Sequence, residues 1–399
     1  MNSSAVLPLG FRAAAVACGI KKDPNKLDLS LIVSDRAAAA AGVFTQNRVA
    51  AAPVQVSRSR VPSNGVRAIV ANSGNANACT GEGGLADARR MTELVAAHLG
   101  CSPDAVLVCS TGIIGERLPI AKIELGIQKA AKEIVAGSET LELAARGIMT
   151  TDTVAKTSVR SAELNDRLIR LAGIAKGAAM IGPNMATMLS FVMTDACVHS
   201  ESLQPMLKAA VNQSFNRISV EGHTSTNDTV LVLANGAAGG SALSGVALAQ
   251  FAGLLRDVCT ELAQAIVRDA EGANHFVTID VEGLRTDAEA HRVAKAIAES
   301  PLVKTAIYGG DPNWGRFVSA AGYAGVEFAE RDLSLWLNGL LLYDHGVPVP
   351  FDAADTSDRL RKEKETHLRL QFTLGTARCQ FWTCDLTEEY IKLNADYHT

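Results

Sequence analysis

The spacing of apolar residues predicts two long helices. Within residues 85–99, apolar side chains recur near every 3.6 residues, and Gly100 follows as a stop signal. Residues 251–266 repeat this pattern more clearly, with Phe251 and Ile266 at the two ends of one apolar face. We expect both segments to be helices that bury one side against another layer of the protein.

Shorter apolar runs predict strands. Residues 277–281 alternate between apolar and polar, which is typical of a strand with one buried side. The β-branched runs 67–71 and 105–109 each lead into a loop that contains glycine. The runs 187–193 and 229–233 are mostly apolar without alternation, and we expect strands buried on both faces.

Strand-like and helical runs alternate along the chain, which predicts an α/β fold with helices packed outside sheets. Its 399 residues suffice for two or three domain-sized units or for one large layered body. Residues 352–365 are polar, charged and without periodicity, and we interpret them as an exposed excursion.

Composition narrows the class of protein. The net charge of −4, without long runs of either sign, does not favour nucleic acid or an anionic membrane as a partner. No apolar stretch reaches the roughly 18 residues that span a bilayer, and the first residues make a poor signal peptide. The eight cysteines are scattered and form no Cys-x-x-Cys pair, so we expect no zinc site and a reduced, cytoplasmic protein.

Two motifs suggest chemistry that their context does not favour. Residues 81–86 match G-x-G-x-x-A and open a helix, as in a dinucleotide site. However, nine residues separate this motif from the preceding strand, and no acidic residue ends the next strand to hold a ribose, so an ordinary helix-opening loop is favoured. Cys109 ends an apolar run and is more readily a core residue than a nucleophile.

Two other segments suggest acyl-transfer chemistry, although each also fits a plain turn or loop. Residues 110–115 follow a strand and combine hydroxyls with glycines, so backbone N–H groups there can converge as an oxyanion hole. Residues 176–189 form a Gly- and Pro-containing stretch that runs into Thr187. Cleavage before Thr187 would place an α-amino group, with a pKa of about 8, beside its hydroxyl as a base.

Across nearly its whole length the sequence resembles the ornithine acetyltransferases, the bifunctional glutamate N-acetyltransferase family of arginine biosynthesis. Each shared motif is weak alone, but their order along the chain is specific. The motifs occupy residues 10–14, 72–78, 109–112, 150–153, 184–189, 224–229, 309–316 and 394–397.

The resemblance implies stacked sheets with outer helices, of αββα type, and self-processing like that of N-terminal-nucleophile enzymes. It implies cleavage between Ala186 and Thr187 into an alpha chain 1–186 and a beta chain 187–399, which stay together as two of each. The implied reaction moves acetyl from N2-acetylornithine to glutamate, without a metal or cofactor; acetyl-CoA as a second donor is left open.

The resemblance also assigns residues. Thr187 is the implied nucleophile, and Thr111 and Gly112 are the implied oxyanion hole. The implied substrate contacts are Thr153, Lys176, Thr187, Glu271, Asn394 and Thr399. A pocket for an amino acid needs one cation and one anion, which Lys176 and Glu271 supply.

The sequence departs from the family at two places. Residues 221–223 read Glu-Gly-His where the family often has Asp-Gly-Asp, and His398 stands where arginine is frequent. The first departure puts the exact substrate preference in question. Two other functions stay open: an N-terminal-nucleophile aminopeptidase or amidohydrolase that passes its acyl group to water, and a non-cleaving nucleotide-binding protein built on residues 81–86.

Overall fold

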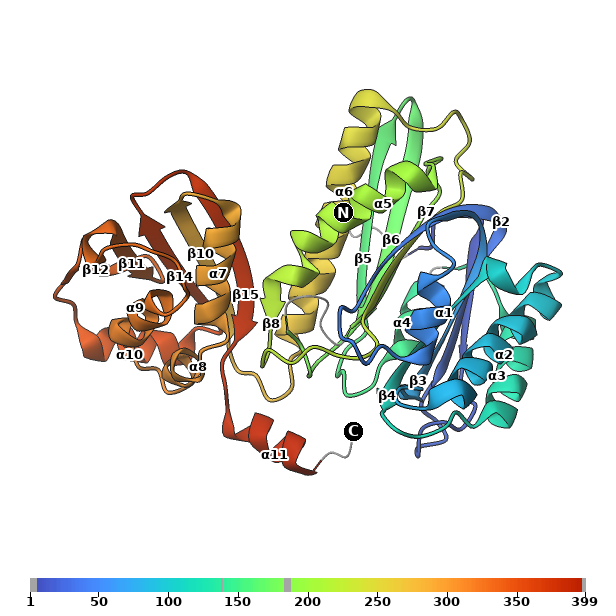
Figure 1. The fold of residues 1–399 in the computed structure, drawn as a ribbon, viewed down its shortest axis with the longest axis horizontal. Helices are drawn as coiled ribbons and strands as arrows, with labels where there is room; N and C mark the ends of the chain where they lie inside the picture. The colour runs from blue at the N-terminus through green and yellow to red at the C-terminus, as the bar shows by residue number, and fades with distance from the viewer. Residues whose placement is uncertain (1–5, 138, 183–187, 397–399) are drawn as a thin grey trace.

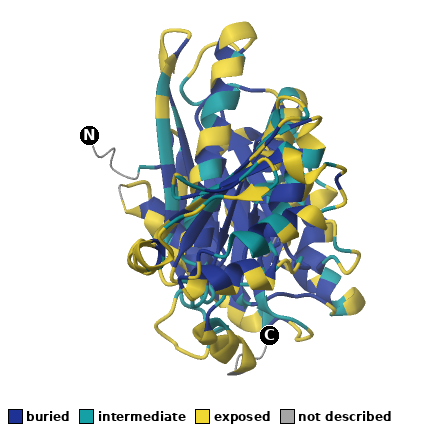
Figure 2. Cartoon of the chain, turned by 90° about the vertical axis from the view of Figure 1, so that its left-hand side faces the viewer, coloured by how far each residue is buried: buried dark blue, intermediate teal, exposed yellow. Residues whose placement is uncertain are grey.

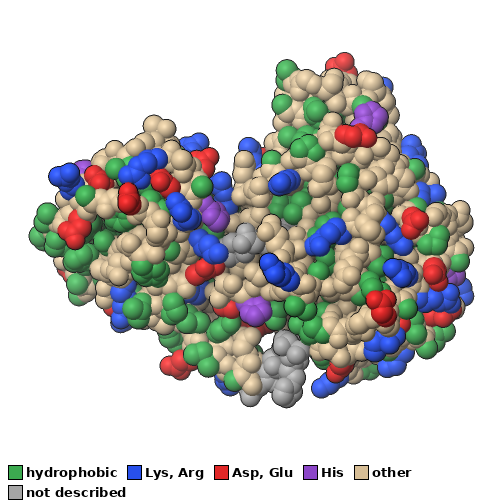
Figure 3. All heavy atoms as spheres, in the orientation of Figure 1, with side chains coloured by type: hydrophobic (Ala, Val, Ile, Leu, Met, Phe, Trp, Pro, Cys, Tyr) green, Lys and Arg blue, Asp and Glu red, His purple; other side chains and the backbone are tan. Residues whose placement is uncertain are grey.

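The structure, a computed structural model, describes residues 6–137, 139–182 and 188–396. These residues form two lobes, each built around one sheet (Figure 1). The space-filling view in Figure 3 shows a notch in the surface between them. Basic and acidic side chains are interspersed over the face seen in Figure 3. Among the described residues, no helix has both the length and the apolar character needed to cross a membrane.

The first lobe holds an eight-stranded sheet with the strand order β4-β3-β2-β9-β7-β6-β5 and with β1 paired to β2. Its strands are β1 (Phe11–Val16), β2 (Leu29–Phe44), β3 (Ser63–Asn75), β4 (Val106–Ile113), β5 (Lys156–Leu164), β6 (Arg167–Lys176), β7 (Leu189–Thr194) and β9 (Thr229–Ala234). Its helices are α1 (Ala52–Arg58), α2 (Gly81–Leu99), α3 (Ile120–Glu133), α4 (Thr140–Ile148), α5 (Ser200–Asn212) and α6 (Gly245–Arg268).

The long strand β2 divides this sheet into two layers. Its first part pairs with β1 and β3, and its second part pairs with β9 and, as far as Ala40, still with β3. Side chains from both layers meet in one core, where Ile32, Ile69 and Leu107 of the first layer join Phe191 and Leu231 of the second. The two layers are therefore stacked face to face, with α4 packed into the same core.

Helices cover both outer faces of the stack, and Figure 2 shows the buried strands between exposed outer surfaces. Met91 of α2 and Ile123 of α3 pack on the outer face of the β1–β4 layer. Phe251 and Leu262 of α6, together with α5, pack on the outer face of the other layer. The predicted αββα arrangement of stacked sheets with outer helices is confirmed.

The elements with strong sequence patterns form as predicted. Helix α2 ends at Leu99, and Gly100 caps it with a left-handed φ of 64°. Helix α6 contains the predicted residues 251–266 and extends them at both ends. The parallel neighbours β7 and β9 are buried at every position, because sheet layers and helices cover both of their faces.

Three predictions about local structure were wrong in whole or in part. The loops expected after residues 71 and 109 are still strand, because β3 and β4 stay paired as far as Asn75 and Ile113. Residues 352–365 are mostly exposed, as predicted, but they contain helix α10 (Ala353–Lys362). The Asp352 side chain caps α10 by accepting from two backbone N–H groups, and Thr356 and Leu360, one turn apart, are its buried residues, too few to show as a periodic pattern.

The second lobe is a seven-stranded sheet with the order β13-β12-β11-β14-β10-β15-β8, covered by helices. Its elements are β8 (Ile218–Ser219), β10 (Phe276–Leu284), α7 (Asp287–Ala298), α8 (Pro301–Tyr308), α9 (Trp314–Gly322), β11 (Leu333–Leu337), β12 (Leu340–Asp344), β13 (Val347–Pro348), α10, β14 (Glu365–Phe372) and β15 (Ala377–Cys384). After β15 the chain leaves this lobe and forms α11 (Glu388–Asp396), which lies near the lower end of the first lobe (Figure 1).

Candidate active site

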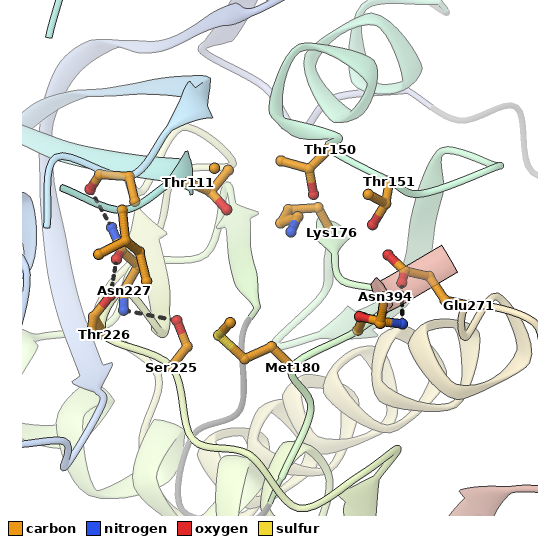
Figure 4. A pocket seen from close by; sticks show the side chains of 14 residues that line it. Thr111, Thr150, Thr151, Lys176, Met180, Ser225, Thr226, Asn227, Glu271 and Asn394 are labelled. Carbon is orange, nitrogen blue, oxygen red and sulfur yellow. Dashed lines mark hydrogen bonds between the residues drawn. The ribbon is translucent and has the colours of Figure 1, made fainter. Parts of the chain in front are cut away.

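A pocket forms in the first lobe where the ends of several strands meet the end of α6 and helix α11 (Figure 4). It collects five of the residues predicted from the sequence, although they come from four separate parts of the chain. The lining residues are Ala76, Thr111, Gly112, Ile114, Thr150, Thr151, Lys176, Ala179, Met180, Ser225, Thr226, Asn227, Glu271 and Asn394.

One wall of the pocket is the irregular end of the β3–β4 pair. Asn75 pairs with both Thr111 and Ile113, so the ladder shifts register there. Such a bulge turns backbone groups away from regular pairing and is frequent beside active sites. Gly112 has a φ of 133°, and a Cβ atom on it would lie 2.3 Å from the carbonyl carbon of Gly74. Only glycine fits this backbone position.

Asn227 holds this wall in place. Its side-chain amide donates to the carbonyl oxygens of Ala76 at 2.7 Å and Ser110 at 2.8 Å. The residue is buried, as are its neighbours Ser225 and Thr226. In the sequence, residues 224–229 stood out only as a motif shared with the family. The run of hydroxyl and amide side chains in this motif was the available signal that these three residues line a site.

Lys176 ends β6 and is buried beneath the pocket, with its side chain close to Thr150 in Figure 4. Burial lowers the pKa of Lys176, and Asp152 is the charge that opposes this effect most strongly. Burial alone would raise the pKa of Asp152, but the two lysines Lys176 and Lys156 lower it to about 2. The positive charges of the two lysines and the negative charge of Asp152 therefore offset one another beneath the pocket.

Glu271 and Asn394 form the opposite side of the pocket. Glu271 follows the end of α6, and its backbone N–H donates to the Ala178 carbonyl at 2.9 Å. Asn394 on α11 donates from its amide to the Glu271 carboxylate at 3.1 Å. Helix α11 is held there by Thr387, whose hydroxyl donates to the Gly272 carbonyl at 2.7 Å. Helix α11 is thus part of the pocket wall.

One further predicted residue, Thr153, lies beside the pocket. Thr153 lines an adjoining cavity of about 790 Å³, which shares Thr150, Thr151 and Glu271 with the pocket, and its backbone N–H and hydroxyl both donate to Asp269. The predicted nucleophile Thr187, with Ala186 and Thr399, lies outside the described residues.

The structure describes the residues directly after Thr187, and they begin beside the pocket. The Met188 N–H donates to the buried Asp228 carboxylate at 3.1 Å, and burial raises the pKa of Asp228 well above its usual range. The next residue, Leu189, pairs with Lys176 of β6. The start of β7 is therefore in register with a lining residue of the pocket.

Comparison with known proteins identifies the family. Residues 12–399 match the ArgJ family. The chain belongs to the ArgJ family. It is 47% identical to the arginine biosynthesis bifunctional protein ArgJ of Geobacter sulfurreducens, over 98% of this chain and 99% of that protein. It is 42% identical to the protein of the same name from Rhodopirellula baltica, over 100% of this chain and 98% of that protein.

A solved structure agrees with this assignment. The arginine biosynthesis bifunctional protein argJ of Bacillus halodurans is 39% identical and has a TM-score of 0.52, covering 53% of this chain and 100% of that one. The predicted family, and with it an acyltransferase of arginine biosynthesis, is confirmed for this ArgJ-family chain.

The two less favoured motifs have structural roles in this ArgJ-family fold. Cys109 is buried in the core between the two sheet layers, and burial raises the pKa of its thiol, which leaves it a poor nucleophile. In the motif at residues 81–86, Gly81 opens α2 with a left-handed φ of 59°, and a Cβ on Gly83 would meet the end of the Arg117 side chain. The left-handed backbone accounts for Gly81 without a nucleotide.

Proposed function

We propose that the chain transfers the acetyl group of N2-acetyl-L-ornithine to L-glutamate through an acetyl ester on Thr187. Self-cleavage of the Ala186–Thr187 bond would first make Thr187 an N-terminal residue. The observation that carries the proposal is the convergence of the backbone at Thr111 and Gly112 with a buried cation and an anion in one pocket, beside the strand that Thr187 precedes.

The charges of the pocket suit an amino acid with a cationic side chain. Lys176 would bind the substrate carboxylate, and Glu271 would bind the ammonium at the end of ornithine. Glu271 follows the C-terminal end of α6, where the helix dipole also favours positive charge. The amide of Asn394 offers both a donor and an acceptor, so it could serve acetylornithine and glutamate in turn.

The backbone is constrained a few residues before the proposed cleavage site. Met180 has a left-handed φ of 59°, and Gly182 packs so closely on Gly222 that a Cβ on Gly182 would lie 2.4 Å from the Gly222 carbonyl carbon. The Thr187 hydroxyl would attack the Ala186 carbonyl carbon, and the C–N bond would break to give an ester and a free α-amine. Water would then hydrolyse the ester, leaving a carboxylate on Ala186 and the hydroxyl on Thr187.

The transfer step would reuse that hydroxyl. The Thr187 α-amine takes the hydroxyl proton as the oxygen attacks the acetyl carbonyl carbon. Backbone N–H groups at Thr111 and Gly112 would stabilise the resulting oxyanion. The C–N bond breaks, ornithine leaves with the proton, and the neutral amine of glutamate attacks the acetyl ester to complete the transfer.

The fold would keep the two cleavage products together. Strand β7 follows the cleavage site, but it pairs with β6, and β9 pairs with β2 of the preceding segment. The B. halodurans chain, matched over its whole length, covers 53% of this one, and the segment after Ala186 is also slightly more than half of the chain. We extend the proposal to a tetramer of two alpha and two beta chains and to acetyl-CoA as a second donor that loads the same Thr187.

Acetylornithine alone should acetylate the fragment that begins at Thr187. Because the acetyl group rests on the enzyme between two half-reactions, intact-mass spectra should show that fragment heavier by one acetyl group, and initial-rate plots should be parallel. Incubation with ornithine is the matched control and should add no mass. Intersecting plots without a trapped acetyl group would contradict a covalent intermediate, and release of acetate in place of transfer would indicate the amidohydrolase.

Removal of residues 394–399 should weaken substrate binding while leaving self-cleavage intact. The truncated protein loses the Asn394 amide that contacts Glu271, so its KM for acetylornithine should rise about tenfold or more, as expected for lost hydrogen bonds to charged groups. Truncation of residues 397–399 alone separates the contribution of Asn394 from that of the last residues. A protein without residues 394–399 that retains normal KM and kcat would remove α11 from the site.

A further inference from the structure

A cluster of four charged side chains lies buried beneath the pocket and its adjoining cavity. Lys156 has 1% of its side chain exposed and sits between two carboxylates, Asp152 with 0% exposed and Asp269 with 7%. Its ammonium donates to Asp152 at 2.7 Å and to Asp269 at 2.5 Å. The fourth member is Lys176, whose strand β6 pairs with β5 so that Ala175 lies opposite Lys156.

Each carboxylate of the cluster also holds a segment of the site. Asp152 accepts from the backbone N–H of Gly177 at 2.6 Å and of Thr150 at 2.9 Å. It thereby fixes the turn directly after Lys176 and one of the lining threonines. Asp269 accepts from both the backbone N–H and the hydroxyl of Thr153.

We infer that Lys156 is a positioning residue for substrate recognition: by neutralising Asp152 and Asp269 together, it keeps Thr153 in place and leaves Lys176 available for a substrate carboxylate. The inference rests on the proposed function, which supplies the roles of Thr153 and Lys176. Lys156 itself is too deeply buried to touch substrate.

The charge balance explains why a second cation is needed. Asp152 and Asp269 carry two negative charges in a region that excludes water, where unpaired charges are strongly disfavoured. Lys176 already lowers the pKa of Asp152, and without Lys156 it would be drawn into an internal ion pair with that carboxylate. Asp269 would lose its partner, and Thr153 would lose a fixed acceptor.

Replacement of Lys156 by methionine should therefore act on binding. The KM for acetylornithine should rise about tenfold or more while kcat falls less than about threefold, the pattern expected when an interaction made equally in the ground state and the transition state is lost. Lys156→Arg keeps the charge and should restore KM to within about threefold of the wild type. Unchanged KM in Lys156→Met, or failure of Lys156→Arg to restore it, would overturn the inference.

A matched control separates positioning from stability. Lys304 is another buried lysine, 3% exposed, which donates to Thr383 and Cys384 in the second lobe. Lys304→Met removes a buried ammonium away from the cluster, so it should lower the melting temperature but leave KM unchanged. If Lys304→Met raises KM as much as Lys156→Met does, the effect is a general loss of stability and the inference fails.

A second variant tests the cluster if Lys156→Met does not fold. Asp152→Asn preserves the shape of the side chain but removes the charge that most favours the protonated form of Lys176. The other charged groups that act on Lys176 are Lys156, Asp228, Glu271 and Lys21. The pKa of Lys176 should fall, so KM should begin to rise at a lower pH than in the wild type. Coincident pH profiles of KM would refute the inference, whereas a wild type without acetyl transfer would instead refute the proposed function.

Discussion

Thr187→Ala should yield a single full-length chain without acetyl transfer. The substitution removes the hydroxyl that would attack the Ala186 carbonyl, and without cleavage no α-amine is freed to act as a base. Loss of a nucleophile of this kind typically costs on the order of 10⁴-fold or more in rate. Intact-mass spectrometry should show two fragments for the wild type and one chain for the variant.

A nearby hydroxyl provides the control for this experiment. Ser190 lies on β7 three residues further on, and its hydroxyl is buried without a hydrogen-bond partner among the described residues. Ser190→Ala should cleave and transfer normally, because removal of an unpaired buried hydroxyl costs little. A wild-type protein that is fully active as one uncut chain would end the case for a nucleophile at Thr187.

Gly112→Ala should nearly abolish transfer while leaving the protein folded. A Cβ atom at this position would lie 2.3 Å from the Gly74 carbonyl carbon and 2.5 Å from the Asn75 nitrogen, so the two strand ends must separate. The backbone donors would then move away from the oxyanion, and loss of one such donor costs about 10²–10³-fold in kcat. Steady-state kinetics should show this loss in kcat with little change in KM.

Gly253→Ala is the matched control for this substitution. Gly253 lies within α6 and has nothing within 4 Å of an added Cβ, so alanine there should slightly stabilise the helix and leave kcat unchanged. Normal kcat in Gly112→Ala, with the fold intact, would mean that the end of β4 is an ordinary strand end and not an oxyanion hole.

The sequence predicted those elements that bury a recognisable pattern of apolar residues. Helix α6 was foreseeable because its apolar residues repeat at helical spacing, and strands β7 and β9 were foreseeable because each is a short, nearly continuous apolar run. Helix α10 was not, since Thr356 and Leu360 are its only buried residues among ten. The course of β4 to Ile113 was also missed, because that part is held by pairing with β3 and not by apolar side chains.

The site was predictable by resemblance but not from local pattern. Lys176, Glu271 and Asn394 converge only because β6, α6 and α11 end at the same place, which no local spacing reveals. The ion cluster is less visible still, since Asp269 lies 113 residues from Lys156 along the chain. Such contacts depend on tertiary structure and leave no periodic signal.

The passage of β2 through both sheet layers has a consequence during synthesis. Its second part leaves the ribosome long before its partner β9, which is built from residues 229–234. At typical elongation rates this edge would wait on the order of ten to forty seconds, open to pairing with other chains. The waiting segment reads Ala-Ala-Ala-Ala-Ala-Gly between Arg36 and Val43. Alanine and glycine are poor strand formers, so this composition would protect the nascent chain from aggregation until its partner arrives.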